Sequence, residues 1–373
     1  MNPFLLKGYI SPDYFCDREK ESEKIINSIE NQQDITLFAI RRIGKSALIS
    51  HIFNHLNRSY DCLYVDLWGT TSLSGFINET ASAVIQSTIF SKRSFGKKLT
   101  DFIRSIGASL SIGNDGKPSV DIIIHDRNQV FNRLEEIFQF LEGNSIPVIV
   151  AFDEFQEIKK YTDSMPLEAK LRSLVQRYHN IRFIFSGSEQ HLISDIFSSI
   201  DRPFYQSTRM IELKKIDTTL YHQFIKKHFQ AGNKTITDTL ISHVLTICHG
   251  HTYYIQAISN LIYSLDKIPE TIEAFEDIYR DFIAEKQVFY TELPHRLTKH
   301  QFSTTKAVAS YGKVDGVTTR EFMTRAGIGS PGTMQAVINA LREKQVIIKE
   351  NNYYRLYDVF LEHYLRYFGR TTR

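Results

Sequence analysis

The segment Ala39–Ser46 constrains this chain more than any other, and it reads Ala-Ile-Arg-Arg-Ile-Gly-Lys-Ser. After its first position it matches the phosphate-loop pattern G-x-x-x-x-G-K-[ST]. An apolar run over residues 35–40 leads into it, and apolar residues at helical spacing follow over residues 45–57. A loop between a short strand and a helix in this order predicts an α/β fold, a P-loop NTPase core built on a parallel sheet.

The chemistry of such a loop follows from its place at the start of a helix. Consecutive backbone N–H groups there surround an anionic phosphate. We expect Lys45 to reach the β- and γ-phosphates and the Ser46 hydroxyl to ligate Mg²⁺. The predicted cofactors are therefore ATP and Mg²⁺. The predicted nucleotide-binding residues are Ile40, Arg41, Arg42, Ile43, Gly44, Lys45, Ser46 and Ala47.

Ala39 departs from the pattern, which has glycine at this position. Glycine is favoured where φ is positive or where backbone approaches a ligand closely, and alanine is strained at positive φ. Because the rest of the pattern is intact, we interpret Ala39 as a tolerated variant. The alternative is a pseudo-enzyme that binds nucleotide without hydrolysing it.

A second motif lies about a hundred residues later. Residues 146–154 read Ile-Pro-Val-Ile-Val-Ala-Phe-Asp-Glu, which predicts a buried parallel strand that ends in two carboxylates, a Walker B strand. We expect Asp153 to hold the Mg²⁺ shell and Glu154 to polarise the attacking water.

A third apolar strand, residues 183–185, ends in Ser186-Gly187-Ser188. A small polar group at this strand tip can contact the γ-phosphate or the water. Ser186 is the first candidate and Ser188 the second. The predicted catalytic residues are thus Glu154, Lys45 and Ser186, and the predicted metal ligands are Ser46 and Asp153.

Composition along the chain predicts three domains. Residues 1–213 alternate between strand and helix patterns, with a β-hairpin inserted at about 107–125. Residues 214–290 show only helical periodicity and predict a helical lid. Residues 291–373 predict a winged helix, with Ser330 as the N-cap and Pro331 at the first position of the third helix.

The partner of the winged helix stays open. Residues 296–373 carry thirteen Lys/Arg and six Asp/Glu, 13 − 6 = +7, which suits an anionic partner. The exposed face of the third helix is polar but poor in charge, because it offers Thr333, Gln335, Asn339 and Arg342. Duplex DNA and a protein partner or self-assembly are both compatible with this pattern.

Composition also limits the cellular setting. Cys16, Cys62 and Cys248 are scattered singly, which argues against zinc and disulfides and fits a reducing cytoplasm. No apolar run is long enough for a transmembrane helix, so no membrane partner is expected.

These motifs together resemble the archaeal-type ATPases of the STAND branch of AAA+ proteins, a group also found in bacteria. The resemblance covers nearly the whole chain. It is carried by the segments Asn2–Phe4, Tyr14–Glu21, Arg41–Ser46, Phe152–Glu154, Phe185–Ser188 and Gly250–Tyr254. It implies an ATPase core, a helical lid and a winged helix that work as a slowly hydrolysing, nucleotide-driven conformational switch, regulatory or DNA-associated. The alternative is a non-hydrolysing ATP-binding scaffold in signalling or defence.

Some positions differ from that family. Thr252 replaces the proline that the family usually has two residues after the lid glycine, and no arginine follows Pro203-Phe204-Tyr205 at the expected spot. Arg202 or Arg209 could serve as an arginine finger, with an ordinary surface role as the alternative. His249 and His251 could contact nucleotide or only shape a local turn.

Overall fold

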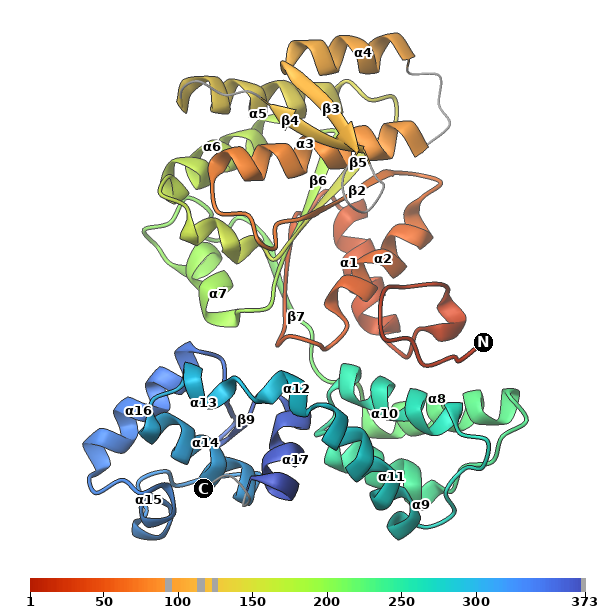
Figure 1. Cartoon of the computed structure of the whole chain (residues 1–373). Coiled ribbons are helices and arrows are strands. Elements are labelled where there is room, and N and C mark those ends of the chain that lie inside the picture. The colour runs from red at the N-terminus through yellow and green to blue at the C-terminus, as the bar shows by residue number, and fades with distance from the viewer. Residues whose placement is uncertain (91–95, 113–117, 123–126, 370–373) are drawn as a thin grey trace. The chain divides into compact units, whose positions relative to one another are not determined.

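The computed structural model describes residues 1–90, 96–112, 118–122 and 127–369, and the chain divides into two compact units (Figure 1). One unit is residues 5–217. The other joins residues 1–4 to residues 218–373. The predicted hairpin turn at 113–116, residues 123–125 of the predicted insertion and the last four residues of the chain lie outside the described part.

A parallel sheet forms the centre of the first unit. Its described strands follow the order β2-β5-β6-β1-β7, and every neighbouring pair is parallel. This confirms the predicted α/β core. The strands are β1 (Ile35–Phe38), β2 (Asp61–Asp66), β5 (Val148–Asp153), β6 (Ile181–Gly187) and β7 (Arg209–Glu212).

Helices cover both faces of this sheet (Figure 1). One face packs against α1 (Glu19–Glu30) and α2 (Lys45–Leu56). The other packs against α3 (Leu73–Phe90), α5 (Arg127–Glu142), α6 (Ser164–Arg177), α7 (Gln190–Ser198) and the short 3₁₀ helix η2 (Phe155–Lys160).

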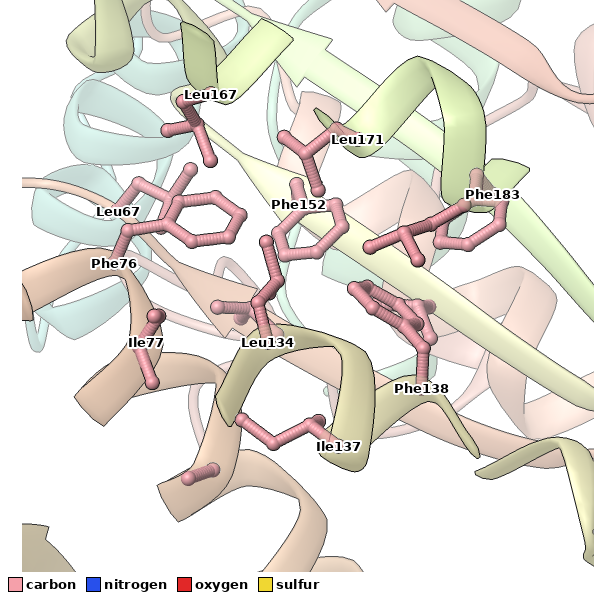
Figure 2. Packing of buried hydrophobic residues seen from close by; sticks show 14 of the residues in the cluster. Leu67, Phe76, Ile77, Leu134, Ile137, Phe138, Phe152, Leu167, Leu171 and Phe183 are labelled. Atoms are coloured by element: carbon pink, nitrogen blue, oxygen red, sulfur yellow. The ribbon is translucent and has the colours of Figure 1, made fainter. Parts of the chain in front are cut away.

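The alternation of side chains along β5 assigns its residues to the two faces. Val150 and Phe152 join the cluster beneath α3, α5 and α6, where Figure 2 shows Phe152 beside Leu134 and Leu171. Ala151 joins the opposite cluster, beneath α1 and α2. Because the side-chain period of a strand is two, Asp153 projects toward the α2 face.

The predicted hairpin is present on α3. Strands β3 (Ala108–Ile112) and β4 (Pro118–Ile122) pair antiparallel after α4 (Gly96–Ser105). The backbone N–H groups of Val120 and Ile122 donate to Ser82 Oγ (3.1 Å) and Asn78 Oδ1 (3.2 Å) on α3. These bonds satisfy two backbone N–H groups of β4 that do not bond to β3, its only described partner strand.

The second unit is helical, with one small β-hairpin. Ser330 caps α16 and Pro331 is its first residue, as predicted. The unit contains α8 (Thr218–Ala231), α9 (Asp238–Ile247), α10 (Thr252–Ser264), α11 (Ile272–Glu285), α12 (Gln287–Tyr290), α13 (Leu293–Arg296), α14 (Lys299–Tyr311), α15 (Arg320–Ala326), α16 (Pro331–Glu343), β8 (Ile347–Glu350), β9 (Tyr353–Leu356) and α17 (Val359–Phe368). No described helix has both the length and the hydropathy needed to cross a bilayer. The predicted boundary at 290/291 lies within this unit and stays a prediction.

The turn between α9 and α10 packs against the C-terminal hairpin and helix. Arg355, which is fully buried, donates to Nε2 of His251. His249 Nε2 lies 3.3 Å from Glu362 Oε2. The structure thus gives both histidines a local structural role on this turn.

Asp34, just before β1, links this strand to both of its neighbours, β6 and β7. Its carboxylate accepts a hydrogen bond from Phe183 N (2.8 Å), and its backbone carbonyl accepts one from Arg209 N (2.9 Å). Burial raises the pKa of the Asp34 carboxyl to about 6, although the Phe183 N–H and the Arg182 and Arg172 guanidinium groups oppose this shift.

Replacing Asp34 by asparagine tests this burial. Because the pKa of Asp34 is higher in the folded than in the unfolded protein, proton binding by this carboxyl stabilises the folded state. That contribution is complete below about pH 4 and is lost as pH rises through about 6. Asp34→Asn keeps the acceptor oxygen without the charge, so we expect it to raise the free energy of unfolding by about 2 kcal/mol at about pH 8. Urea denaturation should show little gain at about pH 4, and equal gains at both pH values would contradict the account.

Candidate functional site

The loop between β1 and α2 holds Ala39 without backbone strain. Ala39 is fully buried, and its N–H donates to Gly187 O (3.3 Å). Its φ is not positive, whereas Arg42 (φ 65°) and Gly44 (φ 99°) adopt the left-handed conformation. The positive-φ positions of the turn are therefore Arg42 and Gly44, of which glycine adopts this conformation without strain, and the methyl group of Ala39 packs in the core.

The end of this loop is anchored from α1. Ile43 is buried, and its carbonyl accepts a hydrogen bond from Arg18 Nη2 (3.4 Å), whose side chain is 3% exposed. Gly44 is the N-cap of α2, and no described side chain caps that helix. The N-terminus of α2 thus presents backbone donors and a positive dipole end, which favour an anion.

Asp153 lies at the centre of the site, opposite the first turn of α2. Its Oδ1 pairs with the Lys45 ammonium and accepts from the Ser186 hydroxyl. Its Oδ2 accepts from Ser46 Oγ (2.6 Å) and from the Tyr64 hydroxyl. Side chains from three neighbouring parts of the fold, β2, β6 and α2, thus converge on one carboxylate at the end of β5.

Electrostatics of this cluster favour the charged carboxylate. Burial alone would raise the pKa of Asp153, but the Lys45 ammonium and hydrogen bonds from Ser186 and Ser46 outweigh it and hold the pKa well below its usual range. Burial, and then the nearby Asp153 charge, raise the pKa of Tyr64. Tyr64 is therefore a neutral hydrogen-bond donor at neutral pH.

Glu154 follows in the left-handed conformation, with φ 53°, and turns its side chain beside the same ammonium. Its Oε1 lies 3.7 Å from Lys45 Nζ. Its Oε2 accepts from Ser188 Oγ (2.6 Å) and from Gln156 Nε2. Of the two candidate serines, Ser186 thus contacts Asp153 and Ser188 contacts Glu154.

The structure brings together six residues singled out from the sequence. They are Lys45, Ser46, Asp153, Glu154, Ser186 and Ser188. Sequence reasoning missed Tyr64 and Gln156. The available signals were the strand period, which puts Tyr64 on the same face as Asp66 opposite Asp153, and the position of Gln156 two residues after Glu154.

The two candidate arginine fingers are engaged within the first unit. Arg202 is 14% exposed and pairs with Glu168 (2.9 Å) and Asp195 (2.8 Å). Arg209 Nη1 donates to Ser28 Oγ (2.9 Å). Arg202 therefore joins α6 to α7, and Arg209 joins the edge strand β7 to α1.

The residues present fit a nucleotide with Mg²⁺. The hydroxyl of Ser46 and the carboxylate of Asp153 are oxygen ligands of the kind that Mg²⁺ takes together with substrate phosphates. The described residues contain no cluster of three or more His, Cys, Asp or Glu that would form an all-protein metal cage. Lys45 and the start of α2 offer positive charge to phosphate oxygens.

Comparison with known families assigns most of the chain. Residues 15–258 match a family described as an ATPase domain predominantly from Archaea. Residues 288–367 match a probable winged helix domain. No curated protein sequence matches this chain.

Solved structures with a similar fold span nearly the whole chain. The Walker-type ATPase PABY2304 of Pyrococcus abyssi has a TM-score of 0.67 at 20% identity and covers 98% of this chain and 99% of its own. The Aeropyrum pernix ORC2 protein in ADPNP–ADP complexes has 0.58 at 12%, covering 99% and 98%. The A. pernix ORC1 protein in complex with DNA has 0.52 at 11%, covering 96% and 94%. At these identities the likeness shows the fold.

Removing one partner of the buried Lys45–Asp153 pair should strongly lower the stability of the protein. Lys45→Met leaves the Asp153 carboxylate buried without its cation, so the free energy of unfolding should fall by about 3–5 kcal/mol. The double variant Lys45→Met/Asp153→Asn should recover at least half of this loss in urea denaturation at neutral pH. Arg104→Met, which removes an exposed ion pair to Asp101, is the control and should change stability by less than about 1 kcal/mol. A double variant no more stable than Lys45→Met would contradict the pairing.

Proposed function

Because this chain belongs to the family of ATPase domains found predominantly in Archaea, we propose that it binds ATP with Mg²⁺ and hydrolyses it slowly as a nucleotide-driven conformational switch. The observation that carries the proposal is the convergence of Lys45, Ser46, Asp153 and Glu154 at the N-terminus of α2. Affiliation with the STAND branch, the three-domain division and a cytoplasmic location belong to the same proposal.

Each residue has a distinct role in this proposal. Residues 40–47 wrap the phosphates with backbone N–H groups, and Lys45 neutralises their charge. Ser46 and Asp153 hold Mg²⁺, which when bound supplies charge stabilisation to the phosphate oxygens. Glu154 accepts the proton of the attacking water, and Ser186 contacts the γ-phosphate.

Lys45 also explains how nucleotide could change the protein's state. In the structure its ammonium pairs with Asp153 and lies 3.3 Å from Ser186 Oγ. Phosphate oxygens offer that ammonium a second anionic partner. A ligand shifts a conformational equilibrium by its differential affinity for the two states, and these contacts differ between ATP and ADP.

Substituting the two key side chains tests the enzyme assignment. Lys45→Ala should abolish binding of Mg-ATP in calorimetry, because the phosphate charge loses its counter-ion. Glu154→Gln should bind Mg-ATP with wild-type affinity but release no phosphate. Glu30→Gln, an exposed carboxylate on α1, is the control and should behave as wild type.

Two outcomes of this assay would change the conclusion. Phosphate release that survives in Glu154→Gln would refute Glu154 as the base. Wild-type protein that binds Mg-ATP but releases no phosphate would favour the non-hydrolysing scaffold in signalling or defence.

We further propose duplex DNA as a partner of the C-terminal winged helix. One structural relative, the A. pernix ORC1 protein, was solved in complex with DNA. Here α16 exposes Thr333, Gln335, Asn339 and Arg342 in a region with net charge +7. A helix of this kind could enter a major groove. A protein partner bound by the same face is the second candidate.

Salt dependence separates these partners in the full-length protein. We expect fluorescence anisotropy with a labelled duplex to show binding that weakens steeply between about 50 and 200 mM salt. Arg342→Ala should weaken binding and reduce the salt slope by about one, as expected for a lost phosphate contact. The exposed Arg104→Ala is the matched control. Absence of duplex binding with ATP and with ADP would favour the protein partner.

A further inference from the structure

The two oxygens of the Glu154 carboxylate have different surroundings. Oε2 accepts two hydrogen bonds, from Ser188 Oγ (2.6 Å) and from Gln156 Nε2. Oε1 accepts no hydrogen bond from any described residue and faces the Lys45 ammonium at 3.7 Å. One oxygen is therefore fixed, and the other is directed toward the group that would neutralise phosphate.

Arg41 determines which way the Ser188 hydroxyl points. Arg41 Nε donates to Ser188 Oγ (3.1 Å), and a guanidinium can only donate. The hydroxyl has a single proton, so it donates that proton to the acceptor-only carboxylate of Glu154. Arg41 is itself held by Glu189 Oε1 (3.3 Å) and by the ring of Trp68, whose centroid lies 4.9 Å from the guanidinium carbon.

Gln156 is fixed in one orientation by the same carboxylate. Its side chain is fully buried, and its Oε1 finds no hydrogen-bond partner among the described residues. Turning the amide over would put that oxygen against Glu154, so the NH₂ group faces the carboxylate. A Cβ on Gly187 would collide with Gln156 Oε1 and with Ile193, which makes glycine necessary for this packing. An unsatisfied buried carbonyl is costly, so packing alone would favour an apolar side chain here.

We propose that Ser188 and Gln156 are positioning residues for the base Glu154, and that Arg41 orients Ser188 for this purpose. The inference rests on the proposed function, in which Glu154 accepts the water proton. With Oε2 anchored from behind, only Oε1 can reach that proton, and the carboxylate cannot rotate away from it. Arg41 thus acts on the base from the phosphate loop.

Kinetics of three variants test this role. Ser188→Ala and Gln156→Met each remove one donor to Glu154 and should lower kcat about 10- to 100-fold, the range for a lost hydrogen bond to a charged group. Calorimetry should show an affinity for Mg-ATP within about twofold of wild type. Ser188→Thr, which keeps the hydroxyl, should retain most of kcat. Ser199→Ala, which removes a hydroxyl-to-carboxylate bond to Asp195 (3.0 Å) away from the site, is the matched control.

Stability separates positioning from structural support. Gln156→Met removes the unsatisfied carbonyl and fills the same space, so its urea midpoint should equal or exceed that of wild type while kcat falls. Equal kcat in wild type, Ser188→Ala and Gln156→Met would overturn the inference, as would a fall in kcat that merely tracks loss of stability.

The Glu154→Gln variant distinguishes failure of the positioning role from failure of the proposed function. Turnover that survives in Glu154→Gln refutes the base itself. Turnover that is lost in Glu154→Gln but unchanged in the other two variants refutes only the positioning role. Arg41→Met keeps the backbone N–H that the proposed function assigns to the phosphates, so it should lower kcat with unchanged affinity for Mg-ATP. A weaker affinity alone would make the Arg41 side chain a nucleotide contact and overturn its part in the inference.

Discussion

The buried pair between Lys45 and Asp153 is the interaction on which the rest of the site depends. It joins the first residue of α2 to the last residue of β5, and both side chains are nearly inaccessible to solvent. A buried charge is tolerated only when it is paired and hydrogen-bonded. Accordingly, the hydroxyl groups of Ser46, Tyr64 and Ser186 all donate hydrogen bonds to the Asp153 carboxylate. The polar centre thus fixes how the loop meets the sheet.

Much of this arrangement could be predicted from the sequence, because its signals are local. The apolar run into residues 39–46 located β1 and α2, and the run ending at Asp153 located β5. Ser330 and Pro331 marked the start of α16 in the same way. Parallel strands bring their carboxyl ends to one edge, which is why Lys45, Asp153 and Ser186 could be expected to meet.

Other features depend on pairings that local patterns do not contain. Tyr64 reaches Asp153 because β2 lies beside β5, and strand order is a tertiary property. Residues 1–4 pack with the second unit, where Asn260 Nδ2 donates to Phe4 O (2.8 Å), although the sequence suggested that they belong to the core. The absence of a positive φ at Ala39 could be learned only from the backbone structure, because the sequence pattern does not say which loop positions have positive φ.

A crystal structure with a non-hydrolysable ATP analogue and Mg²⁺ tests the central claim most directly. We expect a triphosphate at the N-terminus of α2, with Lys45 Nζ on phosphate oxygens and the metal held by the Ser46 hydroxyl and the Asp153 carboxylate. A nucleotide bound elsewhere, or a metal without contact to either side chain, would contradict it.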